Sequence, residues 1–265
     1  MPEGHSIHRL ARDHAAWFVG HAIGARSPQG RFAEGAARLN GARVRAVEAY
    51  GKHLVYRVDD DVLHVHLGLF GKFRGWRLPA PAPRPNVRLA LTGPDREVHL
   101  VGPIVCELVD EDALAALLGR LGPDPLRPDS DPDRAFAALR ATRRPIGAAL
   151  LDQAVLAGLG NVYRAELLHL AGVWPGLPSR ALPRERFDQL WADAARLLEV
   201  GVRLGRIVTV PQSLSGVAPS RAGRGDRHLV YGRRSCRVCG GAVARPVLAG
   251  RVCFACPACQ PFGGA

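Results

Sequence analysis

The spacing of hydrophobic residues changes along the chain. In residues 5–19, apolar side chains recur three or four positions apart, as they do on one face of a helix. Residues 43–108 instead contain short runs typical of strands, at 44–47, 54–58, 62–67 and 87–91, and clusters of Gly, Pro and Asp separate these runs. The first part of the chain is therefore predicted to be a helix followed by a β-sandwich or barrel-like sheet.

A proline- and aspartate-rich segment separates this part from a helical one. Residues 119–133 contain four prolines and four aspartates, which predicts a linker without regular structure. After the linker, helical spacing returns at 134–142, 146–157, 162–171 and 184–203. We therefore predict an α+β protein, with a β-sandwich domain at 1–118, the linker at 119–133, a helical domain at 134–228 and a cysteine-rich hairpin at 229–265.

Basic residues outnumber acidic ones, and the excess is concentrated in the second half. The chain has 36 Lys and Arg against 24 Asp and Glu, and residues 135–265 alone have 18 against 7. Such a local excess is expected of a surface that follows the phosphates of a nucleic acid. General solubility is the rival interpretation, although solubility does not require this asymmetry.

The chain lacks the pattern of a membrane span or a signal peptide. No stretch approaches the roughly 18 apolar residues of a transmembrane helix, and no basic segment followed by an apolar one begins the sequence. We therefore expect a cytoplasmic protein that does not bind membranes, and we expect it to be a monomer.

Five of the six cysteines lie close together near the end of the chain. Cys236 and Cys239 form one Cys-x-x-Cys motif, and Cys256 and Cys259 form another, with sixteen residues between the two motifs. Each motif can turn two thiolates toward one tetrahedral ion, and four thiolates complete the shell of a structural Zn²⁺. Cys253 and Cys256 are a competing pair, but the Pro and Gln in and after the second motif favour Cys256 and Cys259.

The segment between the two Cys motifs and the sixth cysteine are expected to have structural roles. Residues 242–252 are long enough for one hairpin, with Gly250-Arg251 as its candidate turn. The sixth cysteine, Cys106, is expected to be a buried hydrophobic side chain.

The first residues have both an ordinary and a chemical interpretation. Proline suits the first turn of a helix, and the helix dipole favours Glu3 there. However, methionine before proline is normally removable, and its removal would leave Pro2 with a free secondary amine. Such an amine can attack the C1′ of a sugar and form an iminium ion, which is a ready electron sink for β-elimination. Glu3 could open the sugar ring as a general acid.

Several motifs in a fixed order together resemble the formamidopyrimidine-DNA glycosylase and endonuclease VIII family. They are Pro-Glu-Gly at 2–4, Gly-Lys-His-Leu at 51–54, His-Leu-Gly-Leu-Phe-Gly at 66–71, Leu-Leu-Asp-Gln at 150–153, Gly-Leu-Gly-Asn-Val-Tyr at 158–163 and Cys-Pro-Ala-Cys-Gln at 256–260. The resemblance covers nearly the whole chain. It implies a β-sandwich, a helix-two-turn-helix domain and a zinc hairpin.

The resemblance also implies an activity and the residues that perform it. It implies a base excision repair enzyme, a DNA glycosylase and AP lyase, that acts on double-stranded DNA. Pro2 would form the Schiff base and Glu3 would be the acid. Lys52, Asn161 and Arg251 would bind phosphates around the flipped nucleotide, and Lys52 and Arg251 would donate protons in the β- and δ-elimination steps.

The local sequence around Lys52, Asn161 and Arg251 gives each of them an interpretation that does not depend on the resemblance. Lys52 begins a strand, and its rival interpretation is a solvated strand end. Asn161 follows two glycines at the start of a helix, where a cap and free amides can receive a phosphate, and an ordinary N-cap is the rival. Arg251 follows Gly250, and a solvated turn charge is its rival.

Leu69 and Phe70 lie in a glycine-flanked loop, where apolar side chains need a cover. The space left by a flipped base would provide it, and burial in the protein's own core is the rival. The pair Leu69-Phe70 resembles the Leu-Tyr pair of endonuclease VIII.

Residues 102–106 do not match the Arg-Arg-Phe-Gly loop of formamidopyrimidine-type enzymes. We therefore expect oxidised pyrimidines to be the preferred substrates.

Two other functions remain open at this point. A zinc-ribbon protein that binds nucleic acid without catalysis would account for the charge and the cysteines, but not for Pro-Glu-Gly at 2–4. An AP lyase with weak glycosylase activity would account for all of these features.

Overall fold

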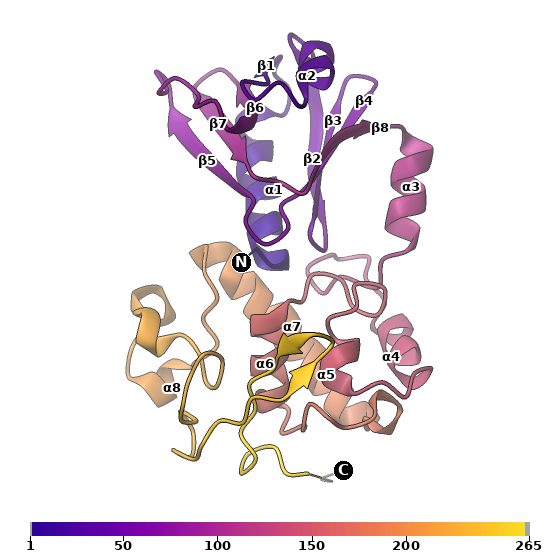
Figure 1. Cartoon of the computed structure of the whole chain (residues 1–265), viewed down its shortest axis with the longest axis vertical. Coiled ribbons are helices and arrows are strands. Elements are labelled where there is room, and N and C mark those ends of the chain that lie inside the picture. Colours follow the sequence, from indigo (N-terminus) through magenta and orange to yellow (C-terminus); the bar gives the residue numbers. More distant parts are fainter. Residues whose placement is uncertain (1, 263–265) are drawn as a thin grey trace. The chain divides into compact units, whose positions relative to one another are not determined.

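The structure is a computed structural model that describes residues 2–262. The chain divides into two compact units after Arg120 (Figure 1). We call the part up to Arg120 unit 1 and the part from Leu121 unit 2.

Unit 1 is a β-sandwich with three helices. In the described part of the chain, its two antiparallel sheets have the strand orders β2-β3-β4-β8 and β1-β6-β7-β5. The strands are β1 (Gly24–Arg26), β2 (Val44–Tyr50), β3 (His53–Val58), β4 (Asp61–His66), β5 (Lys72–Arg77), β6 (Val87–Thr92), β7 (Arg96–Val101) and β8 (Val105–Val109). The helices are α1 (Gly4–Phe18), α2 (Ala33–Leu39) and α3 (Glu111–Gly119). The predicted first helix and β-sandwich are confirmed.

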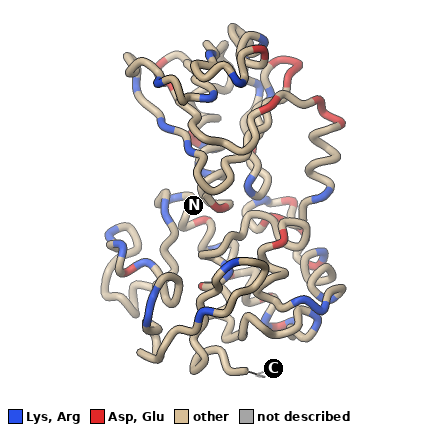
Figure 2. Tube along the Cα trace, in the orientation of Figure 1, with Lys and Arg blue, Asp and Glu red and all other residues tan. Residues whose placement is uncertain are grey.

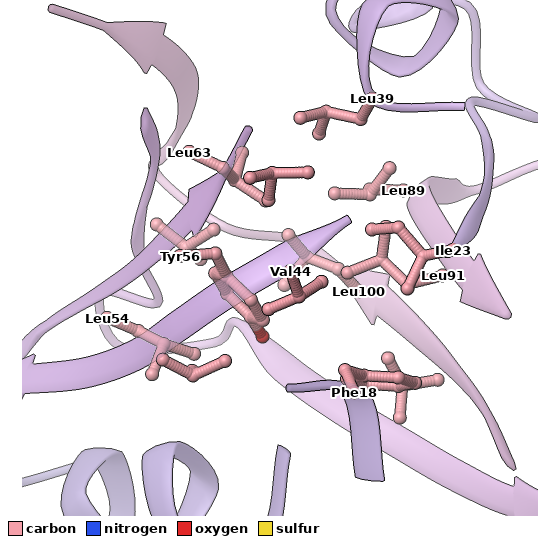
Figure 3. Close-up of a cluster of buried hydrophobic side chains, with 14 of the residues drawn as sticks. Phe18, Ile23, Leu39, Val44, Leu54, Tyr56, Leu63, Leu89, Leu91 and Leu100 are labelled. Atoms are coloured by element: carbon pink, nitrogen blue, oxygen red, sulfur yellow. The ribbon is translucent and has the colours of Figure 1, made fainter. Parts of the chain in front are cut away.

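The core of unit 1 lies between the two sheets and α1. Phe18 of α1, Leu54 and Tyr56 of β3, and Leu89 and Leu91 of β6 are at most 1% exposed (Figure 3). Complete burial of one such side chain stabilises the fold by about 1.5–3 kcal/mol. The sandwich is therefore a firm support for the loops at its ends.

Unit 2 is helical and ends in the cysteine-rich module. Its helices are α4 (Pro132–Arg140), α5 (Ile146–Ala149), α6 (Asn161–Leu170), α7 (Arg184–Leu204) and α8 (Gln212–Ser215), with 3-10 turns at Ser179–Ala181, Pro219–Arg221 and Arg224–Asp226. α6 is buried along almost its whole length and packs against α7 in the core of the unit. Strands β9 (Val247–Leu248) and β10 (Arg251–Val252) form the hairpin near the end of the chain.

The prediction of one helix over 146–157 is wrong, because α5 ends at Ala149. The polar side chains that follow bind the backbone instead. Asp152 Oδ1 accepts a hydrogen bond from Ala154 N (3.0 Å), and Gln153 Oε1 accepts one from Gly158 N (3.0 Å). Such local bonds compete with helix formation.

The two units differ in charge. Unit 2 has 20 Lys and Arg against 11 Asp and Glu, whereas unit 1 has 16 against 13. Basic positions are spread over many segments of unit 2 (Figure 2). The excess that the sequence places in the second half therefore belongs to unit 2.

Candidate active site and metal centre

The strand pairing of the first sheet brings several predicted site residues to one end of unit 1. The end of β2 and the start of β3, which flank Lys52, lie beside the end of β4 and the start of β8. The loop at 67–71 follows β4, and the turn at 102–104 precedes β8. Lys52 therefore lies at the same end of the sheet as Leu69 and Phe70.

Helix α1 brings the start of the chain to this end as well. α1 packs along β2 and ends beside the start of this strand, where Gly20 N donates a hydrogen bond to Val44 O (2.9 Å). The 15 residues of α1 rise about 22 Å, and the seven residues of β2 extend about 23 Å. The start of α1 is thus level with the end of β2 (Figure 1). Pro2 and Glu3 share the end of unit 1 with Lys52.

Glu3 is completely buried, whereas Pro2 is partly exposed. Glu3 occupies the N-cap position of α1, but its side chain does not cap the helix. Glu3 follows Pro2 directly in the chain and is buried at the start of α1. Met1, whose removal the nucleophile hypothesis requires, lies outside the described residues.

Three histidines, His53, His64 and His66, lie together on the two strands next to Lys52, and none of them was predicted as a site residue. His53 Nδ1 is 2.9 Å from His64 Nε2, and His64 Nδ1 is 3.0 Å from Glu107 Oε1. Burial, with smaller contributions from His66, His64 and Lys52, lowers the pKa of His53 to about 3. His53 is therefore neutral at physiological pH, and Lys52 supplies the positive charge at this turn.

Three apolar side chains project from the two loops at this end. Phe70 is 87% exposed, Leu69 46% and Ile104 68%. The loops are in contact, because a Cβ on Gly68 would lie 2.6 Å from Ile104 Cγ2. The alternative that Phe70 is buried in the protein's own core is therefore wrong. The prediction missed Ile104, although an apolar residue after Gly102-Pro103 was a usable signal.

Asn161 is the first residue of α6, and the N-cap of this helix is Gly160. The ordinary N-cap reading of Asn161 is therefore wrong. Its Nδ2 donates to Val252 O (3.0 Å) of β10, and its Oδ1 accepts from the guanidinium of Arg164. This side chain ties the start of α6 to the strand that begins with Arg251.

The hairpin turns at Ala249-Gly250, both in the left-handed region (φ 51° and 69°), and not at Gly250-Arg251 as predicted. This two-residue geometry suits the twist of a β-hairpin. It places Arg251 at the first position of β10, where the side chain is exposed.

A buried arginine that the prediction missed holds the hairpin against the helices. Arg164 is fully buried within α6. Its guanidinium donates to Gly147 O (3.0 Å), Val252 O (3.2 Å) and, at a longer distance, Leu248 O (3.4 Å). These bonds reach both strands of the hairpin. In the sequence, Arg164 resembles an ordinary solvated position of a helix.

The two Cys-x-x-Cys motifs come together as a possible metal site. The sulfurs of Cys236, Cys239, Cys256 and Cys259 all lie within 4.8 Å of one another, and among the described residues this is the one group with metal-binding geometry. Sγ–Sγ distances are 3.8 Å for Cys236–Cys259 and 3.4 Å for Cys239–Cys256. Tetrahedral Zn²⁺ with bonds of about 2.3 Å requires sulfurs about 3.8 Å apart. The four thiols therefore fit such an ion, and buried Cys253 is not in this group.

Hydrogen bonds support the metal site from the helical core. His169 Nε2 of α6 is 3.2 Å from Cys236 Sγ. Gly241 N donates to Cys239 Sγ (3.4 Å) and is the main cause that lowers the pKa of this thiol to about 7. Gln260 accepts from Cys256 N (2.8 Å) and donates to Val173 O (2.8 Å).

Glu166 anchors the chain that leads into the first Cys motif. Its buried carboxylate accepts from the backbone N–H groups of Leu229 (2.6 Å), Val230 (2.9 Å) and Tyr231 (2.7 Å), and from the hydroxyl of Thr209. These charge-assisted bonds join α6 to the cysteine module, and no sequence motif indicates them.

None of the helices in the described range has both the length and the apolar character needed to cross a membrane.

Comparison with protein families and curated proteins identifies relatives over nearly the whole chain. Residues 1–103 match the formamidopyrimidine-DNA glycosylase N-terminal domain, and residues 121–212 match the formamidopyrimidine-DNA glycosylase H2TH domain. The chain is 45% identical to Endonuclease 8 1 of Mycobacterium tuberculosis, over 98% of this chain and 100% of that protein. It is 34% identical to formamidopyrimidine-DNA glycosylase of Thermus thermophilus, over 86% of each.

Solved structures with a similar fold include complexes of a formamidopyrimidine-DNA glycosylase with DNA. A complex of Lactococcus lactis Fpg with DNA that contains an abasic site has a TM-score of 0.79 and 26% identity, over 98% of this chain and 100% of that one. A complex of the same enzyme with a THF-DNA and an inhibitor has a TM-score of 0.80. From its sequence, its fold and these relatives, the chain belongs to the formamidopyrimidine-DNA glycosylase family.

Proposed function

We propose that this protein is a bifunctional DNA glycosylase and AP lyase of base excision repair, with oxidised pyrimidines as preferred substrates. The observation that carries the proposal is the placement of Pro2 next to buried Glu3, at the end of unit 1 that also holds Lys52. Double-stranded DNA with damaged bases or abasic sites is the proposed partner, and the cytoplasm is the proposed location.

Pro2 is the proposed nucleophile. Its amine, freed by removal of Met1, attacks C1′ of the damaged nucleotide, and the bond to the base breaks with its electron pair on the base. The amine then loses its proton, and the C1′–O4′ bond breaks as O4′ takes up a proton, which leaves an iminium ion at C1′. This ion withdraws electrons from the sugar and allows β-elimination of the 3′ phosphate. δ-Elimination of the 5′ phosphate follows.

Glu3 is the proposed acid that protonates the ring oxygen when the sugar opens. Its position directly after Pro2 supports this role, since a general acid must lie within reach of the reacting group. Lys52, at the same end of unit 1, is the proposed proton donor for elimination and a phosphate ligand.

In unit 2, Asn161 and Arg251 are proposed to bind backbone phosphates. The start of α6 supports this role for Asn161, because a helix N-terminus attracts anions. For Arg251, the support is an exposed guanidinium on a hairpin that Asn161 and Arg164 fix through the carbonyl of Val252.

Leu69 and Phe70, together with Ile104, are proposed to occupy the space of the flipped nucleotide. Their exposure supports this role, because isolated apolar side chains at a loop tip gain most when a base stack covers them. Cys236, Cys239, Cys256 and Cys259 are proposed to hold one structural Zn²⁺, which stabilises the hairpin and performs no chemistry.

Borohydride trapping on duplex oligonucleotides tests the proposal. Separate duplexes carry thymine glycol, 5-hydroxyuracil, 8-oxoguanine or an abasic site. We expect covalent adducts with the abasic site and both pyrimidine lesions, and much less with 8-oxoguanine. Adducts at the abasic site alone would support an AP lyase with weak glycosylase activity. If no duplex gives an adduct, the protein is a non-catalytic DNA-binding protein and the proposal is wrong.

A further inference from the structure

The outward face of the second sheet of unit 1 contains a cavity that the reaction does not use. On β5, Lys72, Arg74 and Trp76 alternate with residues that face the core. Arg74 pairs with His99 of β7 in the sheet, so these two side chains share the outward face. The segment between β5 and β6 supplies the opposite wall of the cavity, which has a volume of about 340 Å³.

This wall is rich in proline. Residues 78–86 read Leu-Pro-Ala-Pro-Ala-Pro-Arg-Pro-Asn, and Pro81, Ala82, Arg84 and Asn86 line the cavity. Proline restricts φ and removes N–H donors, so the wall is stiff and presents side chains to the cavity. The volume lies within the range of small-molecule sites.

The cavity is positively charged. Lys72, Arg74 and Arg84 line it, and no Asp or Glu does. Within the described residues, none of these three cations forms an ion pair with a carboxylate. Glu97 pairs with Trp76 in the sheet and therefore lies on the same face, but it does not line the cavity and already accepts from His99 (2.6 Å), Arg26 (3.0 Å) and Thr92 (2.9 Å). Its charge is thus satisfied within the sheet, and the three cations remain available to an anion.

An aromatic surface stands beside these cations. The Trp76 ring is partly exposed and is 4.4 Å from the ring of His99, which in turn is fixed by Glu97. A tryptophan held in this way can stack on a base, and adjacent Lys and Arg side chains can bind its phosphate. Asn86 adds an amide that can donate to and accept from a base edge.

We propose that this cavity binds an undamaged nucleotide, with its base on Trp76 and its phosphate between Arg74, Arg84 and Lys72. The nucleotide is either a free mononucleotide or one unit of a single-stranded DNA segment, since both offer the same chemistry. The inference goes beyond the proposed function, because the site uses no residue assigned to the reaction and no bond is broken there.

Binding of dTMP, thymidine and (dT)12 to the full chain tests the proposal, through quenching of tryptophan fluorescence and anisotropy of labelled (dT)12. Arg74→Ala and Arg84→Ala should each weaken binding about tenfold, as expected for the loss of a charge-assisted hydrogen bond. Trp76→Leu should remove the quenching. The matched control is Arg77→Ala, which removes the same charge from the same strand outside the cavity and should change affinity less than twofold.

The three ligands distinguish the two sources. Stronger binding of dTMP than of (dT)12 at this site would identify a free-nucleotide site, and the reverse would identify a strand-binding site. Equal affinities for thymidine and dTMP would overturn the proposal, because the cations would then play no part. It is also overturned if Arg74→Ala, Arg84→Ala and Arg77→Ala behave alike. Borohydride trapping at an abasic site is measured on the same variants. Because the cavity contains no residue assigned to the reaction, trapping should be unchanged in them, so failure of the nucleotide site and failure of the proposed reaction are distinguished.

Discussion

The two units fix their site residues by different means. In unit 1, a large apolar core between two sheets supports turns that carry Lys52, Leu69 and Phe70. In unit 2, the apolar cluster around the cysteines contains five buried residues, and the hairpin depends on thiols and buried charges. Small modules with little apolar core generally need a metal or other cross-link. Single polar substitutions should therefore release the hairpin of unit 2, whereas the loops of unit 1 should tolerate them.

The largest effect is expected from removing one metal ligand. Cys259→Ser should lose the zinc, unfold the hairpin and carry Arg251 away from DNA, since ion binding and local folding are coupled. Zinc content and DNA affinity measure this effect. Cys253→Ser is the matched control, because Cys253 is buried nearby but lies outside the four-sulfur group. It should keep the metal and lose only about 1–3 kcal/mol of stability through its buried hydroxyl. Metal loss in Cys253→Ser with retention in Cys259→Ser would make Cys253 a ligand.

Acid should destabilise unit 1 through its buried histidines. Burial lowers the pKa of His5 to about 4 and those of His14 and His53 to about 3, against 6.5 in an unfolded chain. The unfolded state therefore binds more protons between pH 6.5 and about 4, so the free energy of unfolding falls as the pH is lowered through this window. Each group contributes about 1.4 kcal/mol per pH unit.

From pH 6.5 to 5.5 the unfolded histidines become about nine-tenths protonated, so three such groups together lower the free energy of unfolding by about 3 kcal/mol. Denaturant unfolding monitored at several pH values can measure this change. His14→Gln, which keeps a partner for the Tyr56 hydroxyl (2.6 Å in the native pair), should reduce the pH dependence by about one third. His21→Gln, at an exposed position, should leave it unchanged. Equal slopes in both variants would contradict the assignment to buried histidines.

Glu166→Gln should cause the next largest loss of stability. The amide oxygen cannot replace a carboxylate that accepts four hydrogen bonds, so we expect a loss of about 3 kcal/mol in the stability of unit 2. Hydrogen exchange at Leu229, Val230 and Tyr231 should increase in step. The control Glu199→Gln makes the same chemical change at an exposed position of α7. Similar stabilities of the two variants would show that the buried carboxylate does not anchor the module.

The smallest effect is expected from a surface charge. Arg251→Ala should leave stability unchanged and reduce the slope of log K against log salt by about 1, as expected for one lost phosphate contact. Arg186→Ala, at an exposed position of α7, is the control. An unchanged slope in Arg251→Ala would make Arg251 a solvated turn charge.

The sequence was informative where a local pattern determines the structure. The period of the apolar residues was sufficient for α1 and for β2, β3, β4 and β6, and two Cys-x-x-Cys motifs were sufficient to bring four cysteines together. β5 was missed because Lys72, Arg74 and Arg77 hide its alternation. The helix predicted over 146–157 was too long. Asp152 and Gln153 bind backbone N–H groups after the end of α5, and the pattern of apolar residues does not indicate such bonds.

Long-range polar contacts explain the remaining differences. Arg164 and Glu166 lie on a helix whose periodicity suggests ordinary solvated charges, yet both are fully buried. Their partners include backbone groups some 60 to 90 residues away. Backbone groups carry no residue identity, so no motif in a single sequence records such bonds. Ile104 was missed although an apolar residue after Gly102-Pro103 was a usable signal, and its contact with the loop at 67–71 appears only in the structure.

The most direct test of the account is whether the attacking amine is that of Pro2. Borohydride trapping at an abasic site, together with DNA affinity, is compared between the mature chain, a form with an uncleaved N-terminal tag and Pro2→Gly. The account predicts that the tagged form loses trapping while its affinity is nearly intact, and that Pro2→Gly, which has a primary amine, traps more weakly than the mature chain. Trapping by the tagged form at the level of the mature chain would contradict the account, because the nucleophile would then be another residue.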